Sequence, residues 1–103
     1  MATIINIDGR IKNEEKFIVY KGKTYKVDDS KNTITRVYAM LGSGGDISNI
    51  ETIDKILKEL LGAEAVKDFS GLCYTDSIVP FIAAMAAVQN KTYEEVEAAF
   101  RNA

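Results

Sequence analysis

The longest uninterrupted apolar run of the chain covers residues 78–88. None of its eleven side chains carries a charge or a hydrogen-bonding group. Its length, alanines and methionine favour a helix over a strand. Pro80 fits such a helix only in the first turn, where a missing backbone N–H costs little, with Asp76 or Ser77 as the cap. A helix that is apolar on every side has to be covered by other helices. The pattern therefore predicts a buried central helix over 78–88.

The N-terminal third instead has short β-prone runs. Residues 3–7 are β-rich and end at an Asp-Gly turn signal. Residues 16–20 and 24–27 flank the three-residue connection Lys21-Gly22-Lys23, whose glycine can adopt a positive φ, and this pattern predicts a β-hairpin. We therefore expect residues 1–29 to form a β-ribbon region, whose apolar face needs helices to cover it.

From residue 30 onward the hydrophobic period changes to that of a helix. A first helix is expected to end at Gly42, with one apolar stripe made of Ile34, Val37, Tyr38 and Leu41. The glycine-rich stretch 42–46 is interpreted as a hinge, because it lacks the lysine and the hydroxyl residue of a phosphate-binding loop. A capping box at 48–51 starts a second helix that Gly62 ends, and 63–69 predicts a short third one.

A second capping box, Thr92 to Glu95, predicts the start of a last helix after the central run. The apolar positions of these two C-terminal helices are the candidate site, either as core or as a surface for a partner helix. These positions are Ile78, Phe81, Ile82, Met85, Val88, Tyr93, Val96 and Phe100. The whole pattern predicts an α+β fold that is mostly α: one domain over 1–103, with an N-terminal β-hairpin followed by four to five helices in 30–103.

Charge gives little indication of a nucleic-acid or membrane partner. The formal net charge is −2, and the run 78–88 is far shorter than the roughly 20 apolar residues that a membrane-spanning helix needs. Residues 1–36 carry eight basic and five acidic side chains, a balance of +3, and residues 37–103 carry five and ten, a balance of −5. We interpret this asymmetry as two solvated faces, with attraction between copies as the alternative. The start of the chain has no signal-peptide pattern, so a cytoplasmic location is expected.

Lysines at 16, 21, 23 and 26 surround the predicted hairpin. Lysines on a short ribbon commonly protect its edges from unwanted pairing. The alternative is a small nucleic-acid-binding regulator that uses this basic hairpin and its aromatic residues, although no RNA-recognition motif surrounds them.

The residue types of the chain give few options for catalysis. There is no histidine, which removes the commonest general base and the commonest transition-metal ligand. Cys73 is the one cysteine and is interpreted as a buried structural thiol. The acid pairs at 28–29 and 94–95 suit helix starts. We therefore expect a protein that is not an enzyme, with no cofactor and no metal.

The order of these segments resembles a known family. Residues 22–28 (GKTYKVD) lie in the ribbon, 56–65 (ILKELLGAEA) end one helix and begin the next, and Phe69 and the helix over 78–88 complete the series. This order resembles the small tail assembly chaperones of long-tailed bacteriophages and prophages of Gram-positive hosts, over about residues 17–100.

The resemblance implies a mostly α-helical, non-enzymatic protein in the cytoplasm of a bacterial host cell. Members of that family coat the tape-measure protein before the tail tube polymerises, self-associate, and recruit the tail tube protein. The expected partners are therefore further copies of this chain, a tape-measure protein and a tail tube protein. Such a chaperone holds its long partner by many weak, repeated contacts.

Overall fold

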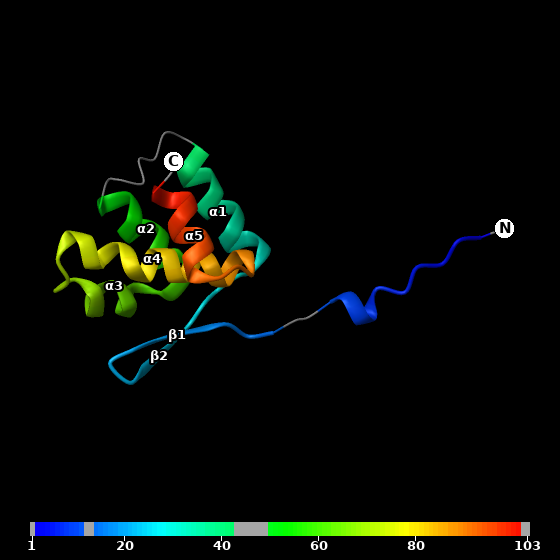
Figure 1. Ribbon diagram of the computed structural model, residues 1–103, viewed down its shortest axis with the longest axis horizontal. Helices are drawn as coiled ribbons and strands as arrows, with labels where there is room; N and C mark the ends of the chain where they lie inside the picture. Colours follow the sequence, from blue (N-terminus) through cyan, green and yellow to red (C-terminus); the bar gives the residue numbers. More distant parts are fainter. Residues whose placement is uncertain (1, 12–13, 43–49, 102–103) are drawn as a thin grey trace.

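A computed structural model describes residues 2–11, 14–42 and 50–101. It has an antiparallel two-stranded hairpin followed by five helices (Figure 1). The α+β, mostly α fold class is therefore confirmed. The elements in order are the 3₁₀ turn Asp8–Arg10, β1 (Phe17–Tyr20), β2 (Lys23–Lys26), α1 (Lys31–Gly42), α2 (Ile50–Leu61), α3 (Ala63–Phe69), α4 (Tyr74–Gln89) and α5 (Tyr93–Arg101).

The predicted hairpin forms, but its turn has two residues instead of three, because Lys23 already belongs to β2 and pairs with Tyr20. Lys21 and Gly22 both have positive φ angles, 51° and 75°, the conformation whose twist matches that of the flanking strands. Ile18 lies opposite Tyr25, and both side chains turn toward the helices. Alternation leaves Phe17 and Val19 on the outer face, where both are exposed.

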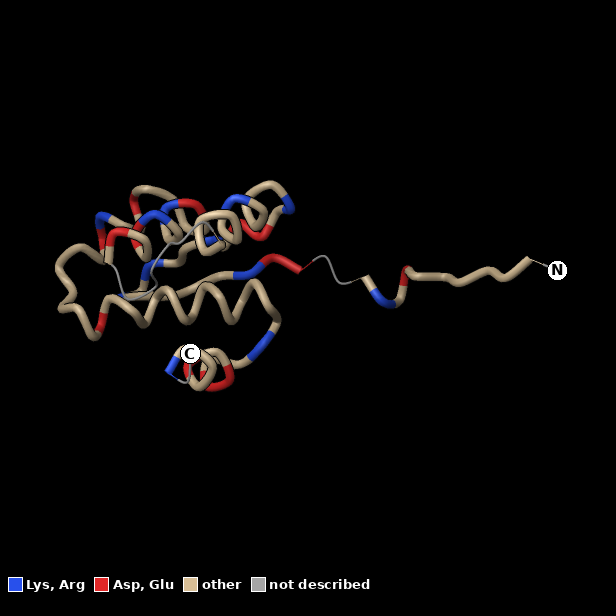
Figure 2. Tube along the Cα trace, turned by 90° about the horizontal axis from the view of Figure 1, so that it is seen from above, with Lys and Arg blue, Asp and Glu red and all other residues tan. Residues whose placement is uncertain are grey.

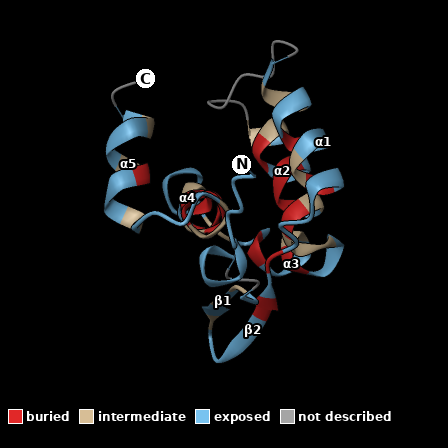
Figure 3. Cartoon of the chain, turned by 90° about the vertical axis from the view of Figure 1, so that its right-hand side faces the viewer, coloured by how far each residue is buried: buried red, intermediate tan, exposed pale blue. Residues whose placement is uncertain are grey.

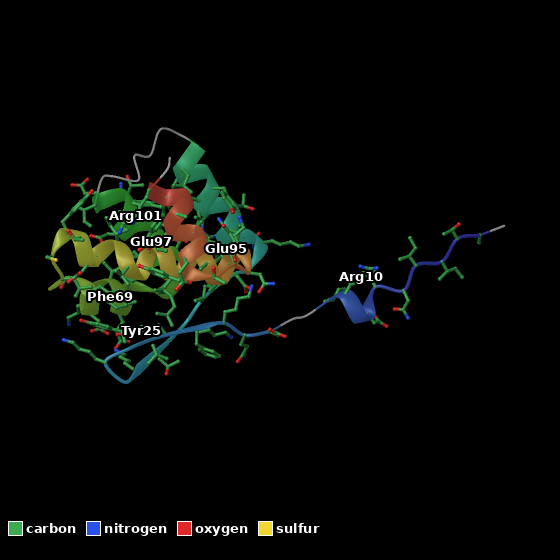
Figure 4. All side chains as sticks on the ribbon, in the orientation of Figure 1. Arg10, Tyr25, Phe69, Glu95, Glu97 and Arg101 are labelled. Atoms are coloured by element: carbon green, nitrogen blue, oxygen red, sulfur yellow. The ribbon has the colours of Figure 1, made fainter. Side chains whose placement is uncertain are left out.

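A small second core holds the hairpin against α3. The rings of Tyr25 and Phe69, both buried, lie 5.3 Å apart (Figure 4). The Tyr25 hydroxyl donates a hydrogen bond of 2.6 Å to Asp68, and the Lys23 ammonium lies 2.9 Å from the same carboxylate. The β-ribbon, which is marginal alone, is thus fixed to the helices by aromatic packing and an ion pair.

The segment between β2 and α1 is closed by a hydrogen-bonded helix start. Asp28 accepts hydrogen bonds from the Ser30 backbone N–H (3.0 Å) and the Thr33 hydroxyl (2.7 Å). The Asp28 backbone N–H donates to the carbonyl of Leu60 in α2. The acid pair 28–29 therefore does belong to a helix start, and Asp28 also ties that start to α2.

The main core lies between α2 and α4, and its largest fully buried side chains come from α2 (Figure 3). Ile53 and Ile56 are fully buried, and Leu57 and Leu60 are 1% exposed.

Figure 3 shows α4 between α5 on one side and α1 and α2 on the other. The prediction that 78–88 is buried on every side is wrong, because Val79 is 46% exposed. The neighbouring helices do not cover the side of α4 on which Val79 lies.

The predicted position of Pro80 is also wrong. The helix begins at Tyr74, with Cys73 as the N-cap, so Pro80 lies well inside it. The backbone N–H of Ser77 already donates to the carbonyl of Cys73. Asp76 and Ser77, expected as caps, form the first turn instead. Proline has no backbone N–H, so the carbonyl of Asp76 lacks its helical hydrogen bond. Asp76 is exposed, so water can take the place of that donor.

Residues 3–7, expected to be β-rich, lie outside the sheet, and Ile7 has the helical backbone angles φ −100° and ψ −2°. They form an arm (residues 2–11) that projects from the helical body and gives the molecule its 60 Å long axis (Figure 1). The predicted Asp-Gly turn is a 3₁₀ turn over Asp8–Arg10. Every residue of the arm is exposed.

Two predictions near the first helix have different outcomes. Gly42 is the last residue of α1, as expected, whereas the rest of the proposed hinge 42–46 and the start of the capping box at 48–51 lie outside the described residues. Tyr38, expected on the buried stripe of this helix, is 49% exposed because the stripe that meets α2 is narrower than the apolar positions suggest.

Candidate protein-interaction surface

The eight candidate residues divide into two sets. Phe81, Ile82, Met85 and Val96 are buried and belong to the core. The other four are half-buried at the margin of the core: Ile78, Val88, Tyr93 and Phe100. Among these, Ile78, Tyr93 and Phe100 come together between α4 and α5. The sequence thus named both sets but could not separate core from surface.

A small groove runs between α4 and α5. Its volume is about 170 Å³, and its apolar walls are Ile78, Val79 and Ile82 of α4 with Tyr93 and Phe100 of α5. The ring of Phe100 packs edge-on against Phe81, with centroids 6.0 Å apart, which anchors α5 on the core. The capping box Thr92–Glu95 is confirmed: the Glu95 N–H donates to the Thr92 hydroxyl at 3.1 Å, and the Thr92 N–H to the Glu95 carboxylate at 3.2 Å.

A larger groove lies on the other side of Val79, between β1 and α4. Its volume is about 480 Å³, within the range of protein cavities that take small ligands or several side chains. Its lining is almost entirely apolar and consists of Ile18, Val19, Tyr20, Phe69, Leu72, Asp76, Val79, Pro80, Ala83 and Tyr93. We refer to this groove as the β1–α4 groove, and to the surface of α4 and α5 around the smaller groove as the α4–α5 face. Val79 and Tyr93 line both.

Few charged side chains lie on this surface: Asp76 lines both grooves, and Glu97 and Arg101 line the smaller one. Along α4 the tube in Figure 2 is free of charged residues after Asp76. At the far border Arg101 forms an ion pair of 3.5 Å with Glu97 on the same helix (Figure 4). Burial against the groove raises the pKa of Tyr93, and the nearby charge of Glu97 raises it further. An apolar centre with a polar rim is typical of protein interfaces.

The other shifted pKa values belong to structural contacts. The Tyr25 hydrogen bond, followed by the Lys23 ion pair, lowers the pKa of Asp68. The same hydrogen bond raises the pKa of Tyr25, and hydrogen bonds to Glu64 and Asp68 raise that of Lys23. Hydrogen bonds from Thr33 and Ser30 lower the pKa of Asp28. These groups hold β2 to α3 and start α1.

Acidic side chains pair with three of the four lysines of the hairpin fringe. Lys16 pairs with Asp29 at 3.0 Å, Lys26 pairs with Glu15 at 3.3 Å, and Lys23 contacts Glu64 and Asp68. Lys21 lies over the ring of Tyr20, 5.3 Å from its centroid. The neighbouring carboxylates reduce the positive potential that a phosphate backbone would need. This arrangement gives the nucleic-acid alternative no support.

Cys73 is exposed at the N-terminus of α4, so the expectation of a buried thiol is wrong. Cys73 is the N-cap residue of α4 and lies in the connection between α3 and α4, outside both helices.

Within residues 2–11, 14–42 and 50–101, no three histidine, cysteine or acidic side chains gather where a metal ion could bind. In the same residues, no helix is long and apolar enough to cross a membrane.

Comparisons of the chain with protein-family models, with curated proteins and with solved structures found no match. The resemblance to tail assembly chaperones therefore stays a prediction that rests on the order of segments alone.

Sequence reasoning missed the residues that open the surface. Val79 and Ala83 lie inside the run 78–88 but were not among the candidates, and the β1 residues Ile18 and Tyr20 were not expected to meet α4. Nothing in an all-apolar helix marks its open side, because every face has the same preference for burial. The approach of β1 to α4 is a long-range contact for which the sequence contains no local signal.

Proposed function

We propose that this chain is a non-enzymatic assembly chaperone of the phage or prophage tail type, which self-associates and covers an apolar helical segment of a tape-measure protein. The observation that carries the proposal is the α4–α5 face, where Val79 and the half-buried Ile78, Tyr93 and Phe100 form one apolar surface on two rigid helices. A helical partner suits this face, because a groove between two helices accepts the apolar stripe of a third.

The weakness of one such contact agrees with the role. A groove of about 170 Å³ buries a few side chains, so one copy bound to one segment has modest affinity. A tape-measure protein is long and helical in the resembled family, and many copies bound along it gain through avidity what each lacks. A tail tube protein, the other partner that the resemblance implies, is part of the same proposal.

The test is co-expression with a tape-measure protein and copurification, comparing two matched variants. Val79→Asp places a charge in the centre of the α4–α5 face, and Tyr38→Asp places one at an equally exposed position of α1, at 46% and 49% exposure respectively. We expect Val79→Asp to lose the partner and Tyr38→Asp to retain it. Equal retention by both variants, or no copurification with the wild type, would contradict the proposal.

A further inference from the structure

The arm carries the most exposed large apolar side chains of the described chain. Ile4 is 88% exposed and Ile5 74%, and Ile7 and Ile11 are exposed as well. Residues 2–6 belong to no helix or strand and run outward from the body (Figure 1). The arm turns at Ile7 (φ −100°, ψ −2°), the N-cap of the Asp8–Arg10 3₁₀ turn, and the Asp8 N–H donates to the Asn6 side chain at 2.9 Å. In an extended segment, Ile5 and Ile7 share one side and Ile4 and Asn6 the other. The arm therefore has the pattern of a half-buried strand without a sheet to join.

A free strand edge is available on β1. The Val27 N–H donates to the Lys16 carbonyl at 2.8 Å, and with the pairing of Ile18 with Tyr25 this fixes which residues exchange hydrogen bonds with β2. In an antiparallel ladder these pairs alternate, so the backbone groups of Phe17 and Val19 point away from β2. Among the described residues, β2 is the sole strand that pairs with β1.

The two edges of the hairpin differ in their protection. β2 carries Lys23 and Lys26, the kind of residue that keeps strand edges unpaired. β1 reads Phe-Ile-Val-Tyr and carries no charge. Its free edge also borders the β1–α4 groove, through Ile18, Val19 and Tyr20. A strand added there would find both unpaired backbone groups and an apolar groove for alternate side chains.

We infer that residues 3–7 of one copy add as a third strand to β1 of a second copy, with Ile5 and Ile7 entering the β1–α4 groove and Ile4 lying beside Phe17 and Val19. The arm leads away from its own body, where another copy can reach it (Figure 1). The added strand would turn a marginal ribbon into a three-stranded sheet and remove the exposed isoleucines from water. The contact gives a physical form to the self-association in the proposed function and rests on that proposal, but its test needs this chain alone.

The first experiment measures self-association of the full chain by sedimentation equilibrium. Ile5→Asp with Ile7→Asp charges the side of the arm that faces the groove, and Ala2→Asp with Asn6→Asp adds the same charge to the opposite side. We expect the first pair to weaken association by about 100-fold or more, from the burial of two isoleucine side chains, and the second pair to change it far less. Equal effects of the two pairs, or a wild type that is monomeric at every accessible concentration, would overturn the inference.

The second experiment traps the contact between copies. In a Cys73→Ser background, copies with Ile5→Cys are mixed with larger, tagged copies that carry Ala83→Cys in the groove. An oxidised product with the mass of one small and one tagged chain is expected, and its absence overturns the inference. A chain that carries both cysteines and crosslinks only within itself would show that the arm folds back on its own β1. Neither readout involves a tape-measure protein, so failure here leaves the Val79→Asp result to decide the proposed function.

Discussion

Helices α2 and α4 are both rich in apolar residues, yet they meet their surroundings differently. α2 alternates apolar and charged positions with the period of a helix, and its four inward side chains are buried almost completely. α4 is apolar on nearly every side, and it buries Phe81, Ile82 and Met85 while Val79 stays in contact with water. The comparison teaches that total apolar content does not predict burial: the amphipathic helix buries its apolar stripe almost completely, and the uniformly apolar helix has surface left over for a partner.

The largest expected effect comes from charging the buried side of α4. Ile82→Asp places an unpaired carboxylate among the core residues, which no partner there can compensate, so the protein should be unfolded at room temperature. Circular dichroism at 222 nm, the wavelength at which helical signal is ordinarily followed, and a thermal melt would measure this. A variant that melts like the wild type would place Ile82 on the surface and remove the distinction between the two sides of α4.

Truncation of the α2 stripe should come next in size. Leu57→Ala removes a side chain that is 1% exposed and leaves a cavity between α2 and α4. The free energy of unfolding should fall by about 2–5 kcal/mol, measured by urea denaturation. A loss well below this range would mean that α2 is less tightly packed than its burial indicates.

A smaller effect concerns the start of α1, which the Asp28 backbone N–H ties to the Leu60 carbonyl of α2. The pKa of Asp28 is lowered in the folded state, mainly by the hydrogen bond from Thr33, so the ionised carboxylate stabilises the fold above its unfolded pKa. That contribution is lost as the pH falls through the lower, folded pKa. The wild type should therefore lose stability below about pH 4, and Asp28→Asn should lose less over the same interval.

Thr33→Val provides a companion to that measurement, because it removes the hydroxyl that donates to Asp28 but keeps the size of the side chain. It should also reduce the pH dependence, since the folded pKa of Asp28 would move toward its unfolded value. Denaturation midpoints at acidic and neutral pH would measure both variants. An acid sensitivity that is identical in the wild type and both variants would assign it to other groups, such as Asp68.

The smallest expected effect comes from a substitution on the exposed side of α4, at Val79. Val79→Ala shortens a side chain that is half in water, so the free energy of unfolding should change by about 0.5 kcal/mol or less. Urea denaturation beside Leu57→Ala would measure the contrast directly. A loss of unfolding free energy as large as that of Leu57→Ala would mean that Val79 is covered in solution. Self-association at the β1–α4 groove would explain such a loss.

The sequence by itself determined the local elements of this protein, because their signals lie within a few residues of one another. Lys21-Gly22 between two β-prone runs specified the hairpin, Gly62 separated α2 from α3, and the spacing of Thr92 and Glu95 started α5. These features depend on backbone conformations and short hydrogen bonds that neighbouring residues supply. The order of a hairpin and then helices followed from them.

Only the tertiary structure decided which apolar side chains form the core and which form a surface. Phe81 and Val79 are two residues apart in one uncharged run, yet Phe81 is 4% exposed and packs on Phe100 of α5, whereas Val79 is 46% exposed between the two grooves. In the same way residues 3–7 have the composition of a strand but no strand beside them in the described chain. The burial of a residue depends on which elements, distant in the sequence, pack against it. The hydrophobic pattern along the chain shows only which side chains favour burial.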